Sequence, residues 1–316
     1  MSVPTTQERI DTLLAGVSAQ VDRVSYFADT IDLSTARATY QELLELLEPQ
    51  LPELRSQAGL SPTASLFASQ AARYGPRRYA QRPVPTDRVF TYWDAPLETA
   101  PPLVRACLAQ ARRCYPSLRV LDGAGARELI GIPPRIAALL EHDRPAHFSD
   151  YVRTRVLAEH GGIWLDATIW LGRPITDELK EDLRAGTIFP RWTRNHIGNW
   201  FIASHPGTPL LTLQRLGLDA WWNAHDDLPD YFLYHRIFDV IQELVPEARG
   251  QWRATPTLSA TKAHLLQLQM MQPWHKRRFE RIMKIGPLQK LSYKYDEVPG
   301  GSVLEHLLTS TGSATG

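Results

Sequence analysis

Residues 145–174 read PAHFSDYVRTRVLAEHGGIWLDATIWLGRP, and this stretch decides how the chain folds. The residues from Pro145 to His160 have the pattern of a helix, and the glycine pair at 161–162 predicts its end. Asp150 and Arg153 are three positions apart. We therefore expect these two side chains to share one face of the helix.

The residues after the glycine pair, Ile163 to Asp166, predict a very short strand. Side chains alternate along a strand, so Trp164 and Asp166 point to the same side of the sheet. Asp166 lies at the carboxyl end of the strand, where ligands bind in open α/β sheets. Because only a tight turn separates the helix from the strand, we expect Asp150, Arg153 and Asp166 to meet at one site.

Outward from this stretch, extended and helical patterns alternate. The predicted strands are Arg88–Trp93, Leu118–Leu121, Thr187–Phe189 and Trp200–Ala203, and the further predicted helices are Leu103–Tyr115, Pro209–Trp222 and Tyr231–Leu244. This alternation is typical of an α/β fold with a mostly parallel sheet.

The first 80 residues have a different, purely helical pattern. Apolar residues recur at helical spacing from Ile10 to Val24, and further helical stretches follow at 34–48 and 64–74. The proline-containing segment 79–87 reads as a linker. We therefore predict a helical module at residues 1–80, an α/β domain at 81–308 and a flexible tail at 309–316.

Composition excludes several classes of protein. The chain has 316 residues, of which 43% are hydrophobic and 22% charged, and its formal net charge is +1. Such a balance gives no reason to expect a nucleic acid partner. The sequence also lacks the GxGxxG and GxxxxGKS phosphate-binding patterns, which argues against a dehydrogenase.

The sequence predicts a cytoplasmic protein. The two cysteines, Cys107 and Cys114, are too few for a disulfide framework and read as reduced thiols. No apolar run approaches the length of a membrane span, and the first residues lack a signal peptide pattern. The protein can still act at the inner face of the membrane, as a peripheral protein, on a lipid-borne acceptor. The oligomeric state is left open.

Two carboxylates and a guanidinium at one site suit a nucleotide-sugar. Carboxylates accept hydrogen bonds from sugar hydroxyls, and the arginine fork holds a hydroxyl or a phosphate oxygen. A divalent cation would offset the charge that builds on a leaving diphosphate. The alternative is structural: Asp150 and Arg153 form a surface pair, and Asp166 caps a turn.

The same residues carry a resemblance to a known family. Ser149-Asp150 and Arg153, followed by the glycine pair and Asp166-Ala167-Thr168, resemble the signature of the glycosyltransferase family 32 sugar transferases. The stretch is still more similar to the bacterial capsular polysaccharide synthesis proteins. Further similar segments are Asn199–Ser204, Asp230–His235 and Lys290–Tyr295, so that the resemblance covers roughly residues 85–305.

The resemblance implies a GT-A-like fold, built around a mixed, mainly parallel sheet, and a set of site residues. Asp166, Asp150 and Arg153 would be catalytic. The donor-binding residues would be Trp93, Tyr92, Ser149, Asp150, Arg153, Gly162, Asp166, Thr168, Asn199 and His264. Trp93 would stack on the base, and the alternative for this ring is core packing.

One departure from the family pattern concerns the metal. Thr168 stands where the family usually has the carboxylate that binds Mn²⁺ or Mg²⁺, and a hydroxyl is a much weaker ligand. The implied metal ligands are Asp166, Thr168 and His235. Alternatively, Thr168 acts through water, or basic side chains replace the cation. His235 and the loop 255–264 are the candidates for completing the site, although both histidines in these segments can equally be structural.

Two further features have functional and structural interpretations. The basic cluster 275–278 could contact phosphates or an anionic membrane, or be a solvated helix face. Trp221 and Trp222 could stack on an acceptor sugar, or pack in the core.

Together these features predict an enzyme. It would move a hexose from a nucleotide-diphosphate sugar to a hydroxyl of a glycan or lipid-linked acceptor, with retention of configuration, in capsular or exopolysaccharide synthesis. The alternative is a catalytically degenerate protein that binds a sugar-nucleotide or a glycan without turnover, which the threonine at position 168 motivates.

Overall fold

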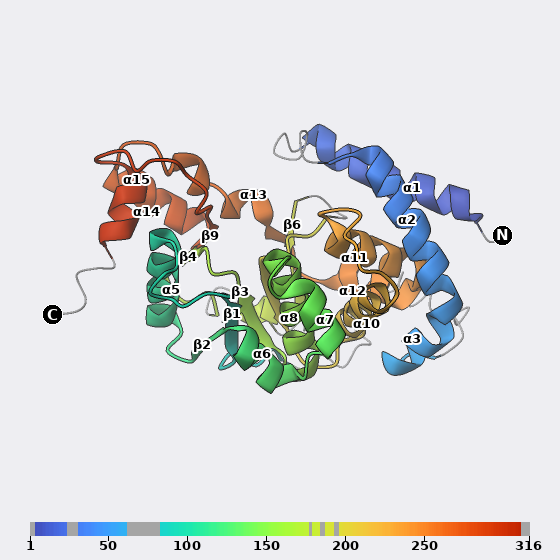
Figure 1. Cartoon of the computed structure of the whole chain (residues 1–316). Coiled ribbons are helices and arrows are strands. Elements are labelled where there is room, and N and C mark those ends of the chain that lie inside the picture. The colour runs from blue at the N-terminus through green and yellow to red at the C-terminus, as the bar shows by residue number, and fades with distance from the viewer. Residues whose placement is uncertain are drawn as a thin grey trace.

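The computed structural model describes residues 4–23, 31–61, 83–176, 179–183, 187–192 and 196–310. Its centre is a five-stranded sheet with the strand order β2-β1-β3-β7-β5, of which Figure 1 labels β1, β2 and β3. The strands are β1 (Val89–Tyr92), β2 (Leu118–Leu121), β3 (Gly162–Leu165), β5 (Thr187–Ile188) and β7 (Phe201–Ser204). β1 pairs in parallel with β2 and β3, whereas β7 is antiparallel to both β3 and β5. Only β7 therefore runs against the other four, which confirms a mixed, mainly parallel sheet.

Helices cover both faces of this sheet because its strands are apolar on both sides. Phe90 and Trp164 face a core that contains α8 (Pro145–His160) and α10 (Pro209–Ala224). Their neighbours Val89 and Ile163 face the opposite side, where α5 (Pro102–Cys114) packs. The alternation of side chains along each strand thus divides the interior into two layers. The α8 side also holds α6 (Gly123–Ile130) and α7 (Pro134–Leu140).

The N-terminal helices extend the core on the α8 side. They are α1 (Thr6–Arg23), α2 (Leu33–Leu47) and α3 (Leu51–Gln57), with a 3₁₀ turn at Glu48–Gln50 before α3. Tyr40 and Leu43 are fully buried in one hydrophobic cluster with Leu210 of α10 and Ile237 of α11 (Leu233–Leu244). In Figure 1 the blue helices α1 and α2 accordingly lie against α11.

The C-terminal part of the chain forms two separate two-stranded sheets with earlier segments. β4 (Ile169–Leu171) pairs antiparallel with β9 (Leu288–Lys290), and β6 (Pro190–Arg191) pairs in parallel with β8 (Leu258–Ser259). The remaining elements are α9 (Lys180–Leu183), α12 (Pro246–Ala254), α13 (Ala260–Ala263), a 3₁₀ turn at Gln267–Gln269, α14 (Lys276–Ile285) and α15 (Val303–Thr309). In the β4–β9 pair, Lys290 lies opposite Ile169. Ile169 follows Asp166 by three positions, so this pairing brings Lys290 close to Asp166.

Most predicted elements occur, with shifted ends. The helix predicted from Tyr231 begins at Leu233, and the strand predicted to reach Phe189 ends at Ile188. The predicted helical stretch 64–74, the domain boundary at 80–81 and residues 311–316 of the predicted tail lie outside the described residues.

Burial decides one of two open interpretations. Trp221 and Trp222 are 0% and 1% exposed, so both rings pack in the core and are not available to an acceptor sugar. The basic residues at 275–278 are exposed at the start of α14, which fits both a solvated helix face and a contact with phosphates or an anionic membrane. None of the helices in the described part of the chain is long and apolar enough to cross a membrane.

Candidate active site

The ends of three strands create the candidate site. β1 and β3 are parallel, so the residues that follow them, Trp93 and Asp166, emerge at the same edge of the sheet. β7 is antiparallel to β3, and Asn199, which precedes it, therefore reaches the same edge from the opposite direction. The backbone N–H of Asp166 donates to the carbonyl of Trp200 at 2.9 Å, which fixes this corner.

Helix α8 runs back along the sheet and places its polar face level with Asp166. Asp150 lies ten residues before the helix ends at His160, a rise of roughly 15 Å. From Gly162 to Asp166 the chain advances four residues, or roughly 13 Å of strand. Because the helix and the strand run in opposite directions and have similar lengths, Asp150 and Asp166 lie at about the same level along the strand direction of the sheet.

The turn between α8 and β3 depends on its glycines. Gly161 and Gly162 have φ angles of +66° and +110°, which L-residues with side chains rarely adopt. A Cβ on Gly162 would lie 2.4 Å from the carbonyl oxygen of Arg88. Only glycine therefore fits this turn, and the turn sets the position of α8 relative to the sheet.

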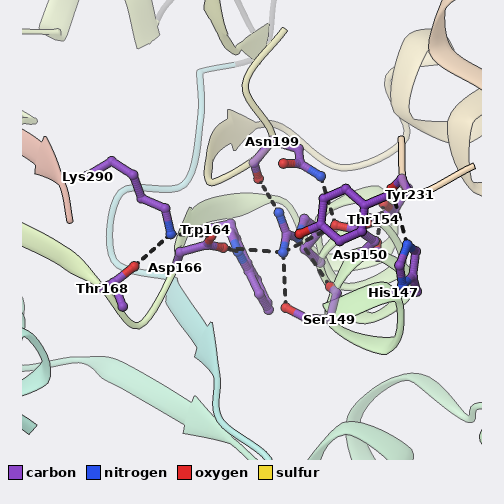
Figure 2. A network of polar contacts seen from close by, with 11 residues as sticks. His147, Ser149, Asp150, Thr154, Trp164, Asp166, Thr168, Asn199, Tyr231 and Lys290 are labelled. Carbon is purple, nitrogen blue, oxygen red and sulfur yellow. Dashed lines mark hydrogen bonds and ion pairs between the residues drawn. The ribbon is translucent and has the colours of Figure 1, made fainter. Parts of the chain in front are cut away.

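Arg153 is the centre of a polar network, and Figure 2 labels its partners Ser149, Asp150, Asp166 and Asn199. Its Nη1 donates to the carbonyl oxygen of Asn199 at 2.6 Å, and its Nη2 donates to Oγ of Ser149 at 3.1 Å. The same Nη2 lies 3.3 Å from Oδ1 of Asp150 and 3.3 Å from Oδ1 of Asp166. One buried guanidinium thus joins the two carboxylates that the sequence predicted to meet.

Each carboxylate has further partners. Asn199 donates its amide Nδ2 to Oδ1 of Asp150 at 2.8 Å, and the indole of Trp164 donates to Oδ1 of Asp166 at 3.0 Å. The ammonium of Lys290 donates to Oδ2 of Asp166 at 2.9 Å and to Oγ1 of Thr168 at 2.6 Å. Lys290 therefore bridges the two polar residues of the Asp166-Ala167-Thr168 segment, as Figure 2 shows.

The two aspartates differ in their pKa shifts. Burial raises the pKa of Asp150 above its ordinary value, although the charge of Arg153 acts in the opposite direction. Burial acts on Asp166 in the same way, but Arg153 and Lys290 together outweigh it and hold the pKa of Asp166 below its ordinary value. The difference follows from the second cation, which contacts only Asp166.

These residues line a cavity of about 360 Å³ at the edge of the sheet. Nine of the predicted site residues line it: Tyr92, Trp93, Ser149, Asp150, Arg153, Asp166, Thr168, Asn199 and His235. Two predicted residues do not. Gly162 lies at the opposite end of β3, and His264 is outside the lining and contacts the rings of Trp192 and Trp200.

Several polar groups in the cavity lining are buried and have no hydrogen-bond partner. They are the hydroxyl of Tyr92, the indole N–H groups of Trp93 and Trp200, and Nδ1 of His235. Burial and the nearby Arg236 charge lower the pKa of His235 to about 3, so its ring is neutral. Buried polar groups are normally paired.

Sequence reasoning did not assign a role to several residues of the lining. These are Asp94, Pro145, Ala146, His147, Ala167, Trp200, Tyr231, Lys290 and Tyr293. Tyr231 and Lys290 belong to segments whose resemblance to the family was noted without a role. Their position at the site depends on long-range contacts that a local pattern does not contain.

The metal ligands implied by the resemblance are only partly assembled. Asp166 and Thr168 lie on either side of the Lys290 ammonium, and His235 lines the same cavity. Within the described residues there is no group of three or more His, Cys, Asp or Glu side chains placed to hold a metal ion.

The family of the chain follows from a comparison with family models. A model described as capsular polysaccharide synthesis protein matches residues 67–307, more than half of the 316-residue chain. The chain belongs to the capsular polysaccharide synthesis protein family. The matched range contains the whole central sheet, α8 and Lys290, whereas α1, α2 and α3 precede it.

Other comparisons add less to the family assignment. Among solved structures, the chain is similar to one titled PaToxG Glycosyltransferase, with 12% identity and a TM-score of 0.39. That similarity covers 76% of this chain and 100% of the other. No curated protein matches the chain. The narrower resemblance to glycosyltransferase family 32 and the GT-A assignment stay predictions.

Proposed function

We propose that this member of the capsular polysaccharide synthesis protein family is a glycosyltransferase. It transfers a hexose from a nucleotide-diphosphate sugar to a hydroxyl of a glycan or lipid-linked acceptor. One observation carries the proposal: Asp150, Arg153 and Asp166 meet in a cavity at the carboxyl edge of β1 and β3. This edge is where open α/β sheets bind ligands.

The donor sugar would lie against the two carboxylates. Asp150 and Asp166 are held in place by Arg153, and their side chains keep 13% and 20% of their surface exposed. Carboxylates positioned in this way accept hydrogen bonds from sugar hydroxyls with little movement of their own side chains. Trp93, which is half-buried and touches Tyr293 edge to face at 5.7 Å, offers a ring for the base.

The reaction would retain the anomeric configuration without a protein nucleophile. In a front-face reaction the bond between the sugar C1 and the diphosphate oxygen breaks, and the acceptor oxygen forms a bond to C1 on the same side. The acceptor proton passes to the departing phosphate oxygen. Catalysis is then positioning and charge stabilisation, which suits carboxylates that are already engaged by Arg153.

The site of action would be the cytoplasmic face of the membrane, where a lipid-linked acceptor is presented. The exposed basic residues at the start of α14, Lys276, Arg277 and Arg278, offer charge for a peripheral contact with anionic lipid.

Donor turnover by the purified protein tests the proposal. The protein is incubated with a panel of UDP- and GDP-sugars, with and without Mn²⁺, and release of nucleoside diphosphate is followed. We expect slow release without an acceptor and at least about a 100-fold loss in both Asp150→Asn and Asp166→Asn.

A matched control is Asp226→Asn, because Asp226 is 72% exposed and lies outside the cavity. This variant should keep full activity, and circular dichroism should show that all three variants are folded. Near-normal turnover in either site variant would show that the site is assigned wrongly. Tight donor binding without any turnover would favour the second candidate, a degenerate sugar-nucleotide binder, which Thr168 motivates.

A further inference from the structure

The position of Lys290 follows from strand pairing. β9 lies antiparallel to β4, with Lys290 opposite Ile169, and the next backbone N–H, that of Leu291, donates to the carbonyl of Thr168 at 3.0 Å. This register sets the lysine side chain beside the segment that starts at Asp166. The ammonium group then lies 2.9 Å from Asp166 Oδ2 and 2.6 Å from Thr168 Oγ1.

We propose that the ammonium group of Lys290 takes the place of a divalent cation and binds the diphosphate of the donor. This inference rests on the proposed function, since it concerns the donor of the same site. It adds a catalytic residue that contacts the leaving group, and it makes donor binding independent of Mn²⁺ and Mg²⁺.

The oxygen atoms near Lys290 do not fit a divalent cation. Mg²⁺ requires close to six oxygen ligands at about 2.1 Å, with one or two carboxylates among them. Here one carboxylate oxygen and one hydroxyl converge, and both accept from the lysine. The other oxygen of Asp166 accepts from Trp164 and faces Arg153. A metal ion between Asp166 and Thr168 would therefore meet an ammonium group at short range.

The charges in the cavity also point to Lys290. The carboxylates that line it are Asp94, Asp150 and Asp166, and the cations are Arg153 and Lys290. A bound diphosphate adds further negative charge, so one cation must face it. Without such a cation the leaving group would meet mainly carboxylates.

Of these two cationic side chains, only that of Lys290 has the freedom to change its conformation. Arg153 is 4% exposed and is held by Ser149, by the carbonyl of Asn199 and by both aspartates. Lys290 has two side-chain partners and keeps 21% of its side chain exposed, on a flexible four-carbon stem. On donor entry the ammonium can move to a phosphate oxygen, and Oδ2 of Asp166 then becomes available to a sugar hydroxyl.

Titration calorimetry with UDP and GDP tests the role of Lys290. Each nucleotide is titrated into the full-length protein in EDTA and again in Mn²⁺, with UMP and GMP as probes that lack the second phosphate. We expect wild-type affinity for the diphosphate to be the same in both buffers within about twofold. In Lys290→Met the affinity for the better diphosphate should fall at least about tenfold, with a much smaller change for the monophosphate.

The matched control is Lys294→Met, which removes the same charge from an exposed position four residues along the same segment. It should bind both nucleotides like the wild type. Donor turnover by the wild-type protein should also persist in EDTA. This arm needs no variant, so the inference stays testable if Lys290→Met does not fold.

The outcomes separate the inference from the proposed function. Diphosphate binding or turnover that requires Mn²⁺ would overturn the role of Lys290 and leave the transferase proposal standing. Equal loss of monophosphate and diphosphate affinity in Lys290→Met would also overturn it. If neither diphosphate binds and no sugar nucleotide is turned over, both the inference and the proposed function fail.

Discussion

At the residue scale, Asp150 and Asp166 show how a second cation distinguishes two buried acids. Both face Arg153, but only Asp166 also faces Lys290. As a result the pKa of Asp150 is raised and that of Asp166 is lowered. A raised pKa in the folded state means that the ionised Asp150 opposes folding: stability falls as the pH rises through that pKa. Asp150→Asn should therefore fold at least as well as the wild type at neutral pH.

The same shifts predict the pH dependence of donor turnover. Asp150 must be ionised to accept hydrogen bonds, and the groups that face it are Arg153, His147, Asp166 and the amide of Asn199. Because its pKa is raised, Asp150 takes up a proton at a higher pH than an ordinary aspartate does. We expect kcat/KM to decline on the acidic side at a pH above the usual aspartate range of about 4.

A variant sharpens this test. Lys290→Met removes a cation from Asp166, so the pKa of Asp166 should rise and the acidic decline should move to higher pH. The profiles are measured in EDTA, with circular dichroism at each pH to show that the fold persists. A profile that is flat down to pH 4 would contradict the assigned role of Asp150.

At the element scale, the α8–β3 unit forms the site because its turn is short and rigid. Gly161 and Gly162 reverse the chain in two residues, and α8 then packs directly on the strand it precedes. A longer or looser turn would let α8 slide along the sheet, and Asp150 would no longer lie level with Asp166.

Substitution of Gly162 should therefore destabilise the protein strongly. Gly162→Ala adds a Cβ at a φ of +110°, 2.4 Å from the carbonyl oxygen of Arg88. Gly207→Ala is the matched control, since Gly207 has a φ of +70° and its Cβ would meet nothing within 4 Å. We expect Gly207→Ala to lose about 1–2 kcal/mol of unfolding free energy and Gly162→Ala to lose clearly more. Urea unfolding monitored by circular dichroism measures both, and equal losses would refute the close approach.

At the scale of the whole molecule, the N-terminal helices are joined to the α/β core by buried polar contacts as well as apolar packing. Tyr40 of α2 donates to Oδ2 of Asp239 on α11 at 2.6 Å. Arg55 of α3 forms two hydrogen bonds with Glu247 of α12, at 2.6 and 2.9 Å. These contacts span about 190–200 positions of sequence.

Loss of the Arg55–Glu247 pair should destabilise the whole protein. The side chains are only 3% and 13% exposed, so Glu247→Ala leaves a buried charge without its carboxylate. We expect a loss of about 3 kcal/mol of unfolding free energy. Arg37→Ala breaks the exposed pair with Asp11 in the same helical region and should cost less than about 1 kcal/mol. Thermal and urea unfolding compare the two, and a small effect of Glu247→Ala would show that α3 is not anchored through this pair.

The sequence by itself determined the structural features that depend on residues close to one another in the chain. The α8 helix, the glycine turn and the strand before Asp166 have local patterns, and only seventeen positions cover Asp150 to Asp166. Their meeting through Arg153 could therefore be predicted. Gly162 was expected at the donor site but lies at the far end of β3, because the role of this glycine is steric.

The tertiary structure alone decided which distant residues complete the site. Lys290, to which the sequence analysis gave no role, is 124 positions from Asp166. Asn199 is 49 positions from Asp150 and was expected at the site only from the family resemblance. Their approach depends on the order of strands in the central sheet and on the register of β4 with β9. Strand order and register result from how all the apolar faces pack at once, so a local pattern of residues does not contain them.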